Sequence, residues 1–213
     1  MTFDTAVSLF GKLPFFDLPA ALQLTGEKRA DLQTQLYRWA RAGKLILLRR
    51  GTYTLAERYR QVVVNPAQLA NEIYRPSYLS GLWALGYYGL IPEHVVRYTS
   101  VTPRTPRRFE NDFGEYEYRH LKAAAFFGYR RVKIQSAEVL MAEPEKALLD
   151  FWHLTTGAWT EDRMTEMRFQ NPAQIRASRL RACAARFASP RLFQAVTAWH
   201  KAVRTASEGT VQL

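Results

Sequence analysis

The stretch RWARAGKLILLRRGTYTL, residues 38 to 55, changes its periodicity halfway along, and this change decides the fold expected for the N-terminal part of the chain. It begins with helical spacing, stops at Gly43, and continues as two short β-prone runs, KLILL and TYTLA, joined by RRG. Glycine readily adopts the positive φ of a tight turn, so Gly51 is predicted at the turn of a β-hairpin. We therefore expect a helix followed directly by a basic hairpin.

The segment upstream predicts two helices. Asp17 is a candidate N-cap for a short helix that ends at Thr25-Gly26. A longer second helix is expected to end at Gly43. Its apolar stripe at helical spacing consists of Leu32, Leu36, Trp39 and Ala40. Two helices and a basic hairpin predict a winged helix-turn-helix over residues 1–64, with the wing tip along phosphates or in the minor groove.

The face of the second helix opposite the apolar stripe carries small residues, amides and arginines. Such a face suits a helix that enters a major groove about 12 Å wide and contacts base edges and phosphates. The alternative interpretation is that these residues form the solvent-exposed face of an amphipathic helix that binds no nucleic acid. Base specificity is assigned to residues 28–38, and the arginines beyond them to phosphate or minor-groove affinity. The predicted DNA contacts are Lys28, Arg29, Asp31, Gln33, Thr34, Gln35, Arg38 and Arg41 on the helix, and Arg49, Arg50 and Thr52 on the hairpin.

The chain of 213 residues has a net charge of +11, and the excess lies in blocks. Residues 1–64 and 97–133 each carry a net charge of +5, residues 134–175 carry −4, and residues 176–204 contain seven Lys/Arg and no Asp/Glu. Net positive charge favours association with polyanions. The chain has no long apolar run and a single cysteine, Cys183. These features predict a cytoplasmic protein without a membrane span or an internal disulfide.

Beyond residue 64 the pattern predicts a second domain, residues 65–213, of α+β class. Helices are expected over residues 65–74, 76–89 and 143–157, and strands within residues 95–109, 114–121 and 130–142. Most segments from Glu161 to Arg204 have helical spacing. The prediction is a small, mostly antiparallel sheet flanked by helices and followed by a helical C-terminal tail.

The order of motifs resembles that of a known family. YLSGLWALGYYGLIPE (78–93), TSVTPRTPRRF (99–109), YEYRHLKAAAFFGY (116–129) and AEPEKALLDFWHL (142–154) follow GTYTL (51–55). This series resembles the AbiEi family of antitoxins and transcriptional regulators from type IV toxin-antitoxin (abortive infection) systems, over residues from about 10 to 155. The matching C-terminal positions, to which no catalytic role is attached, are Tyr78, Ser80, Gly81, Tyr88, Gly89, Arg107, Arg108, Lys122, Glu145, Lys146 and Asp150.

The resemblance implies an autorepressor that binds inverted repeats in double-stranded operator DNA, as a homodimer or as cooperative monomers. It also implies that the C-terminal domain counteracts a co-expressed nucleotidyltransferase-like toxin without forming a stable complex. Three rivals remain open: a standalone regulator without a toxin, a metal-dependent nucleic-acid-processing enzyme, and an antitoxin whose basic tail covers an acidic toxin.

The enzyme alternative depends on a carboxylate cluster in EPEK and the following turn. Glu143, Glu145 and Asp150, with Lys146 nearby, have the composition of a metal-dependent nuclease site. An acidic first helical turn with Lys146 and Asp150 paired at i, i+4 explains the same residues more simply. His94, His120, His153 and His200 lack metal-site spacing. We therefore predict no catalytic residues, no metal and no cofactor.

A second basic segment, TPRTPRRF, is interrupted by two prolines. An extended basic segment of this kind can follow a phosphate backbone, although an exposed loop without a partner is the favoured reading. The candidate residues for a second nucleic-acid or partner surface are Arg104, Arg107, Arg108 and Lys122.

Overall fold

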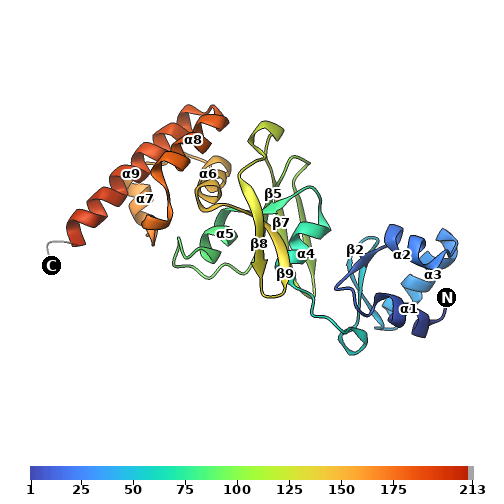
Figure 1. The fold of residues 1–213 in the computed structure, drawn as a ribbon. Helices are drawn as coiled ribbons and strands as arrows, with labels where there is room; N and C mark the ends of the chain where they lie inside the picture. The colour runs from blue at the N-terminus through green and yellow to red at the C-terminus, as the bar shows by residue number, and fades with distance from the viewer. Residues whose placement is uncertain (211–213) are drawn as a thin grey trace.

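The computed structural model describes the backbone of residues 1–210 and the side chains of residues 1–205, and it has the expected mixed α+β composition. Figure 1 shows three parts in a row: a small N-terminal unit in blue, a larger sheet with flanking helices, and the C-terminal helices in orange and red. The two sheets have three and six strands.

The N-terminal unit combines three helices with the small sheet. In chain order its elements are α1 (Phe3–Phe10), β1 (Phe16–Asp17), α2 (Leu18–Thr25), α3 (Arg29–Arg41), β2 (Leu45–Arg49) and β3 (Thr52–Leu55), followed by a short 3-10 helix (Glu57–Tyr59). The sheet order is β1-β3-β2, and both pairings are antiparallel. The predicted α2, α3 and hairpin are therefore present, whereas α1 and β1 had not been predicted from the sequence.

Local chemistry explains where these elements begin and end. The Asp17 carboxylate accepts a hydrogen bond from the Ala20 amide (2.9 Å) and caps α2 as predicted. Gly51 has a φ of +80° at the hairpin turn, which a side chain would disfavour. Leu32 and Leu36 of α3 are fully buried in a core that includes Phe10 of α1. Phe10 stacks on Phe16 of β1, with 4.1 Å between ring centroids, so α1 and β1 complete the core beneath α3.

The larger unit is built on the six-stranded sheet. Its elements are α4 (Pro66–Ile73), β4 (Tyr78–Leu79), α5 (Gly81–Tyr87), β5 (Tyr98–Thr102), β6 (Arg107–Asn111), β7 (Gly114–His120), a 3-10 helix (Ala123–Ala125), β8 (Tyr129–Ile134), β9 (Ala137–Ala142) and α6 (Pro144–Leu154). The strand order is β6-β7-β5-β4-β9-β8.

The six-stranded sheet is mixed, which refines the prediction of a mostly antiparallel sheet. The pairs β6/β7, β4/β5 and β8/β9 are antiparallel, while β5/β7 and β4/β9 are parallel. After β5 the chain runs along the outer edge as β6 and turns back as β7 between the two. The strand β7 is therefore antiparallel to β6 on one side and parallel to β5 on the other.

The prediction of one helix over residues 76–89 is wrong at its start, because this segment begins with the central strand β4. Tyr78 and Leu79 are both fully buried, and they pair with β5 on one side and β9 on the other. A short strand buried on both faces shows no polar alternation, so its pattern cannot be distinguished from that of a helix. The helix α5 begins only at Gly81.

The C-terminal part is helical, as predicted. It consists of α7 (Glu161–Glu166), a 3-10 helix (Pro172–Gln174), α8 (Ala177–Phe187) and α9 (Pro190–Thr210). Leu180 of α8 and Leu192 of α9 are fully buried in the core of the larger unit. Among the described residues, no helix combines the length and apolar character needed to cross a membrane.

The hairpin of the N-terminal unit also contacts the larger unit. Leu48 of β2 is buried in the core of the larger unit, and its carbonyl oxygen accepts a hydrogen bond from Asn111 Nδ2 of β6 (3.1 Å). Val64, next to the predicted boundary between residues 64 and 65, belongs to the same core. One face of the hairpin is therefore covered by the larger unit.

Candidate nucleic-acid interface and a buried polar network

The outward face of α3 gathers most of the predicted DNA contacts. Leu32 and Leu36 fix the orientation of the helix by packing inward, and Gln33 and Thr34 between them are exposed to solvent. The predicted contacts that are exposed on this helix and at its N-terminus are Lys28, Arg29, Asp31, Gln33, Thr34, Arg38 and Arg41. These residues make up the solvent-exposed part of α3 and its N-terminus, which we call the α3 face.

The α3 face is rich in cations that carboxylates do not neutralise. In the part of the chain with described side chains, no carboxylate lies within ion-pair distance of Lys28, Arg29, Arg38 or Arg41. The nearby Glu27 pairs instead with the amino group of Met1. These cationic groups are thus free to meet a phosphate backbone.

Gln35 does not belong to the α3 face, although it had been predicted as a DNA contact. Its side chain is half-buried, and its amide lies within hydrogen-bonding distance of the carbonyl oxygen and the amino group of Met1 (3.2 and 3.3 Å). The flanking position on the helical wheel placed Gln35 near the boundary of the face, and α1 together with the N-terminus covers that side.

Tyr37 is a residue of the α3 face that the sequence interpretation missed. Its side chain is 61% exposed, and the Arg41 guanidinium lies 6.0 Å from its ring centroid. The signal was available, because Gln33, Tyr37 and Arg41 follow one another at i, i+4 spacing and therefore share a side of the helix. An exposed aromatic ring among cations adds an apolar contact surface to the face.

The hairpin turn retains only one of its three predicted contacts. Arg50 is exposed at the turn. Thr52 is 4% exposed and lies on the side of the hairpin that faces the larger unit. Arg49 is half-buried and lines a small cleft with Asp17 and Glu72, on the side of the larger unit. Thr52 and Arg49 thus face inward, contrary to the prediction, because adjacent unit surfaces cover this side of the hairpin.

Two arginines of the second basic segment, TPRTPRRF, make contacts within the protein that the sequence did not indicate. The Arg104 guanidinium lies 4.4 Å from the Tyr74 ring centroid and donates a hydrogen bond to the Arg75 carbonyl oxygen (2.9 Å). Arg108 pairs with Glu117 on the neighbouring strand (2.9 Å). Arg107 and Lys122 are exposed. TPRTPRRF is therefore partly the strand β6 and partly an anchored turn, rather than one extended basic segment.

A network of buried polar side chains lies between α6 and the sheet. Lys146 and Asp150 of α6 form the i, i+4 ion pair that the spacing predicted, but both side chains are fully buried rather than solvated. Lys146 Nζ donates to the Tyr78 hydroxyl (2.9 Å), and Tyr78 and Ser80 donate to Asp150 Oδ2 (3.1 and 2.8 Å). Four positions of the family resemblance thus meet in one cluster, which we call the Lys146 network.

Burial dominates the electrostatics of the Lys146 network. Desolvation raises the pKa of Asp150 and lowers the pKa of Lys146, because it opposes the charged form of each, while their ion pair acts in the opposite direction. Desolvation and the Asp150 charge both raise the pKa of the Tyr78 hydroxyl. The rings of Phe127 and Phe187 enclose Lys146 Nζ at 5.0 and 4.7 Å. The four polar side chains of the network, Tyr78, Ser80, Lys146 and Asp150, are each 0–1% exposed.

The carboxylates considered for a metal site are instead paired with α8. Glu143 forms an ion pair with Arg179, and Glu145 Oε1 accepts a hydrogen bond from the Arg176 amide (3.0 Å). A search of the described residues found no cluster of three or more His, Cys, Asp or Glu side chains that could hold a metal ion. The acidic first turn of α6 therefore anchors α8 to α6.

Comparisons with known proteins assign neither a family nor a function to the chain. No protein-family model matches the chain, and no curated protein matches it either. The functional interpretation therefore depends on the side chains of the α3 face, on the buried Lys146 network, and on the resemblance of the motifs.

Proposed function

We propose that this chain is a cytoplasmic, sequence-specific DNA-binding repressor. In this proposal residues 1–64 form a winged helix-turn-helix, with α3 as the recognition helix and β2–β3 as the wing. The observation that carries the proposal is the α3 face, on which Lys28, Arg29, Arg38 and Arg41 are exposed without carboxylate partners among the described side chains. Sequence-independent affinity for DNA arises mainly from such cation–phosphate contacts.

The dimensions of α3 agree with this role. Its 13 residues span about 20 Å at 1.5 Å per residue, which suits a helix lying in a major groove. Side chains along the part of a recognition helix that lies in the major groove contact base edges. We assign base contacts to Arg29, Gln33 and Arg38, and backbone contacts mainly to Arg41.

The wing contributes through Arg50 alone. We exclude Arg49 and Thr52 from the proposed interface, because both line the cleft between the hairpin and the larger unit. A single exposed arginine at a turn can contact a phosphate or enter the minor groove, where negative potential favours it.

This assignment predicts different effects for two adjacent arginines. Arg50→Ala is expected to weaken DNA binding on all sequences and to reduce the magnitude of the salt slope by about one unit, because one phosphate contact is lost. Arg49→Ala removes the same charge one residue earlier and is expected to leave the slope unchanged. Fluorescence anisotropy titrations at several salt concentrations measure both. Equal slope changes for the two variants would show that the hairpin meets DNA on a different face.

We further propose that the larger unit acts as an antitoxin against a co-expressed nucleotidyltransferase-like toxin, without a stable complex, and that the protein represses its own operon through inverted repeats. The resemblance of the motifs between residues 51 and 154 to the AbiEi family supports this proposal. The enclosed Lys146 network supports a structural rather than catalytic role for four of the resembling positions, since a substrate cannot reach side chains with 0–1% exposure.

The antitoxin role is tested separately from repression. If a nucleotidyltransferase-like gene adjoins the coding sequence, full-length protein carrying Arg38→Ala is expected to rescue growth from that toxin while failing to repress the promoter. Rescue is measured by colony counts and repression by a reporter gene. Loss of both functions in a folded Arg38→Ala protein would tie neutralisation to DNA binding, and co-purification of the two proteins would favour a protein-binding antitoxin. Absence of such a gene would favour a standalone regulator.

A further inference from the structure

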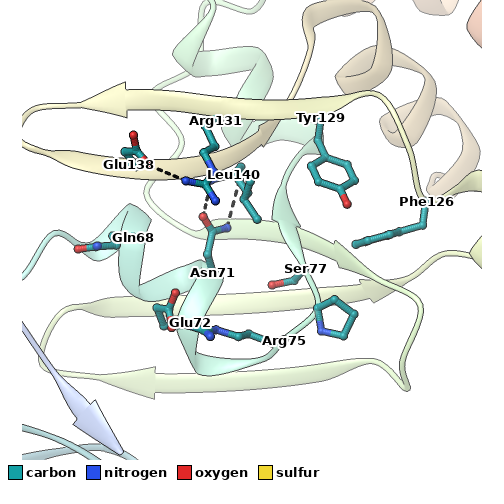
Figure 2. Close-up of a pocket in the computed structure, with 11 residues that line it drawn as sticks. Gln68, Asn71, Glu72, Arg75, Ser77, Phe126, Tyr129, Arg131, Glu138 and Leu140 are labelled. Atoms are coloured by element: carbon teal, nitrogen blue, oxygen red, sulfur yellow. Dashed lines mark hydrogen bonds and ion pairs between the residues drawn. The ribbon is translucent and has the colours of Figure 1, made fainter.

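A cleft of about 460 Å³ opens between α4, the start of β4 and the β8–β9 hairpin (Figure 2). None of its lining residues belongs to the α3 face or to the Lys146 network. Its walls combine two aromatic rings, two arginines with their carboxylate partners, two amides and a hydroxyl. The aromatic rings belong to Phe126 and Tyr129, the guanidinium groups to Arg75 and Arg131, and the hydroxyl to Ser77. The volume lies within the range of small-molecule sites.

The aromatic wall is a fixed platform. The Tyr129 ring stacks on the buried Tyr78 ring, with 4.4 Å between centroids and an interplanar angle of 18°. Phe126 packs beside both rings, 5.3 Å from Tyr129 and 4.9 Å from Tyr78. Tyr129 itself is 36% exposed and lines the cleft. A planar base can stack on such a ring irrespective of its identity, because every base presents a π face.

The floor of the cleft contains an unused hydrogen-bonding group. Ser77 is 3% exposed, and its hydroxyl has no hydrogen-bond partner within the described part of the chain. In Figure 2 this hydroxyl points towards the side of the cleft on which Asn71 lies. A buried hydroxyl without a partner is unfavourable, so a rotation of the Ser77 side chain that brings its hydroxyl to a polar atom of a bound ligand would be stabilising.

Two arginines lie at the rim of the cleft, each paired with a carboxylate that an anionic ligand could displace. Arg131 pairs with Glu138 across the hairpin (3.0 Å), and Arg75 pairs with Glu72 on α4. The two arginine side chains are 76% and 67% exposed. Exposed ion pairs contribute little to stability. A phosphate group, which accepts two parallel hydrogen bonds from a guanidinium, can therefore replace either carboxylate.

We propose that this cleft is a nucleotide-binding site, in which the base stacks on Tyr129, a polar group of the ligand meets Ser77, and the phosphate binds Arg131 and Arg75. The ligand is a free mononucleotide or the terminal nucleotide of a strand, since both present the same chemistry. The proposal does not depend on DNA binding by the α3 face, because the two sites share no residues.

Isothermal titration calorimetry of the full-length chain tests the site with AMP, GMP, CMP and UMP, and separately with inorganic phosphate and with adenosine. We expect saturable binding of at least one mononucleotide at one site per chain, and weaker binding of phosphate or adenosine alone. Tyr129→Ala and Arg131→Ala should each weaken nucleotide binding about tenfold or more, whereas Tyr129→Phe should retain it. Circular dichroism melting verifies that each variant is folded.

Two matched controls separate this site from other cationic surfaces. Arg130→Ala removes the same charge from the adjacent position of β8, where alternation directs the side chain to the opposite face, and it should bind as the wild type does. Arg38→Ala, on α3, should also leave nucleotide affinity unchanged. A 5′-phosphorylated RNA strand that binds more tightly, with the same loss in Tyr129→Ala, would identify a strand end as the ligand.

Three results would overturn the proposal. The first is the absence of binding for all four mononucleotides at millimolar concentrations. The second is an equal loss of affinity in Arg130→Ala and Arg131→Ala, which would indicate unspecific charge attraction. The third is phosphate alone binding as tightly as the nucleotides, which would exclude stacking on Tyr129.

Discussion

Replacing Lys146 with methionine is expected to lower the free energy of unfolding by about 3–5 kcal/mol. The substitution keeps most of the side-chain volume but leaves the Asp150 carboxylate without its cation in a fully buried position. The hydroxyl groups of Tyr78 and Ser80 still donate to Asp150, yet they cannot neutralise its charge. An uncompensated buried charge is among the costliest single defects in a folded protein.

Equilibrium unfolding in urea, followed by circular dichroism, measures this effect. Lys133→Ala, at an exposed position of β8, provides the control and should change stability by less than about 0.5 kcal/mol. Adding Asp150→Asn to Lys146→Met should recover part of the loss, because it removes the unpaired charge. If Lys146→Met proved as stable as Lys133→Ala, the Lys146 network would not hold the larger unit together.

Arg38→Ala is expected to weaken binding to the preferred DNA sequence by about 1–3 kcal/mol, because it removes a guanidinium assigned to base readout. Arg38 is exposed in the last turn of α3. Binding to unrelated duplexes should fall less, since only the charge contributes there. Anisotropy titrations at fixed salt measure both affinities, and Lys133→Ala again serves as the control. Equal losses on both duplexes would reassign Arg38 to the phosphate backbone.

Much of the N-terminal unit could be predicted because its signals are local. The apolar stripe of α3, the Asp17 cap and the turn at Gly51 are each determined by neighbours in sequence, and each is present in the structure. The roles of Arg49 and Arg50 were not predictable in the same way. Which face of the hairpin is covered depends on contacts such as Asn111 with Leu48, from a strand 63 residues away.

The Lys146 network shows the same division between local and distant information. The i, i+4 spacing of Lys146 and Asp150 correctly predicted an ion pair. Its complete burial follows from Tyr78 and Ser80, which lie 68 to 72 residues earlier in the chain. These two residues occupy a strand and a helix start that the sequence interpretation had merged into one helix. Their proximity to α6 could not be inferred from spacing.

The cleft of Figure 2 had no sequence signal at all. Its residues come from α4, from the turn before β4, and from the β8–β9 hairpin. Each of these segments has an ordinary local pattern, and they are brought side by side by the parallel pairing of β4 with β9 and by the hydrogen bonds of Asn71 on α4 with the Leu140 backbone of β9. Sites assembled by sheet order require the tertiary structure.

The central claim, that α3 reads DNA sequence, is tested most directly by selecting bound duplexes from a randomised library with the wild-type chain and with the Gln33→Ala/Arg38→Ala variant. We predict that the wild type enriches one defined motif, present as inverted repeats if two copies bind together, and that the variant loses this enrichment while still binding DNA weakly. Enrichment of the same motif by both proteins, or no enrichment by the wild type, would contradict the account.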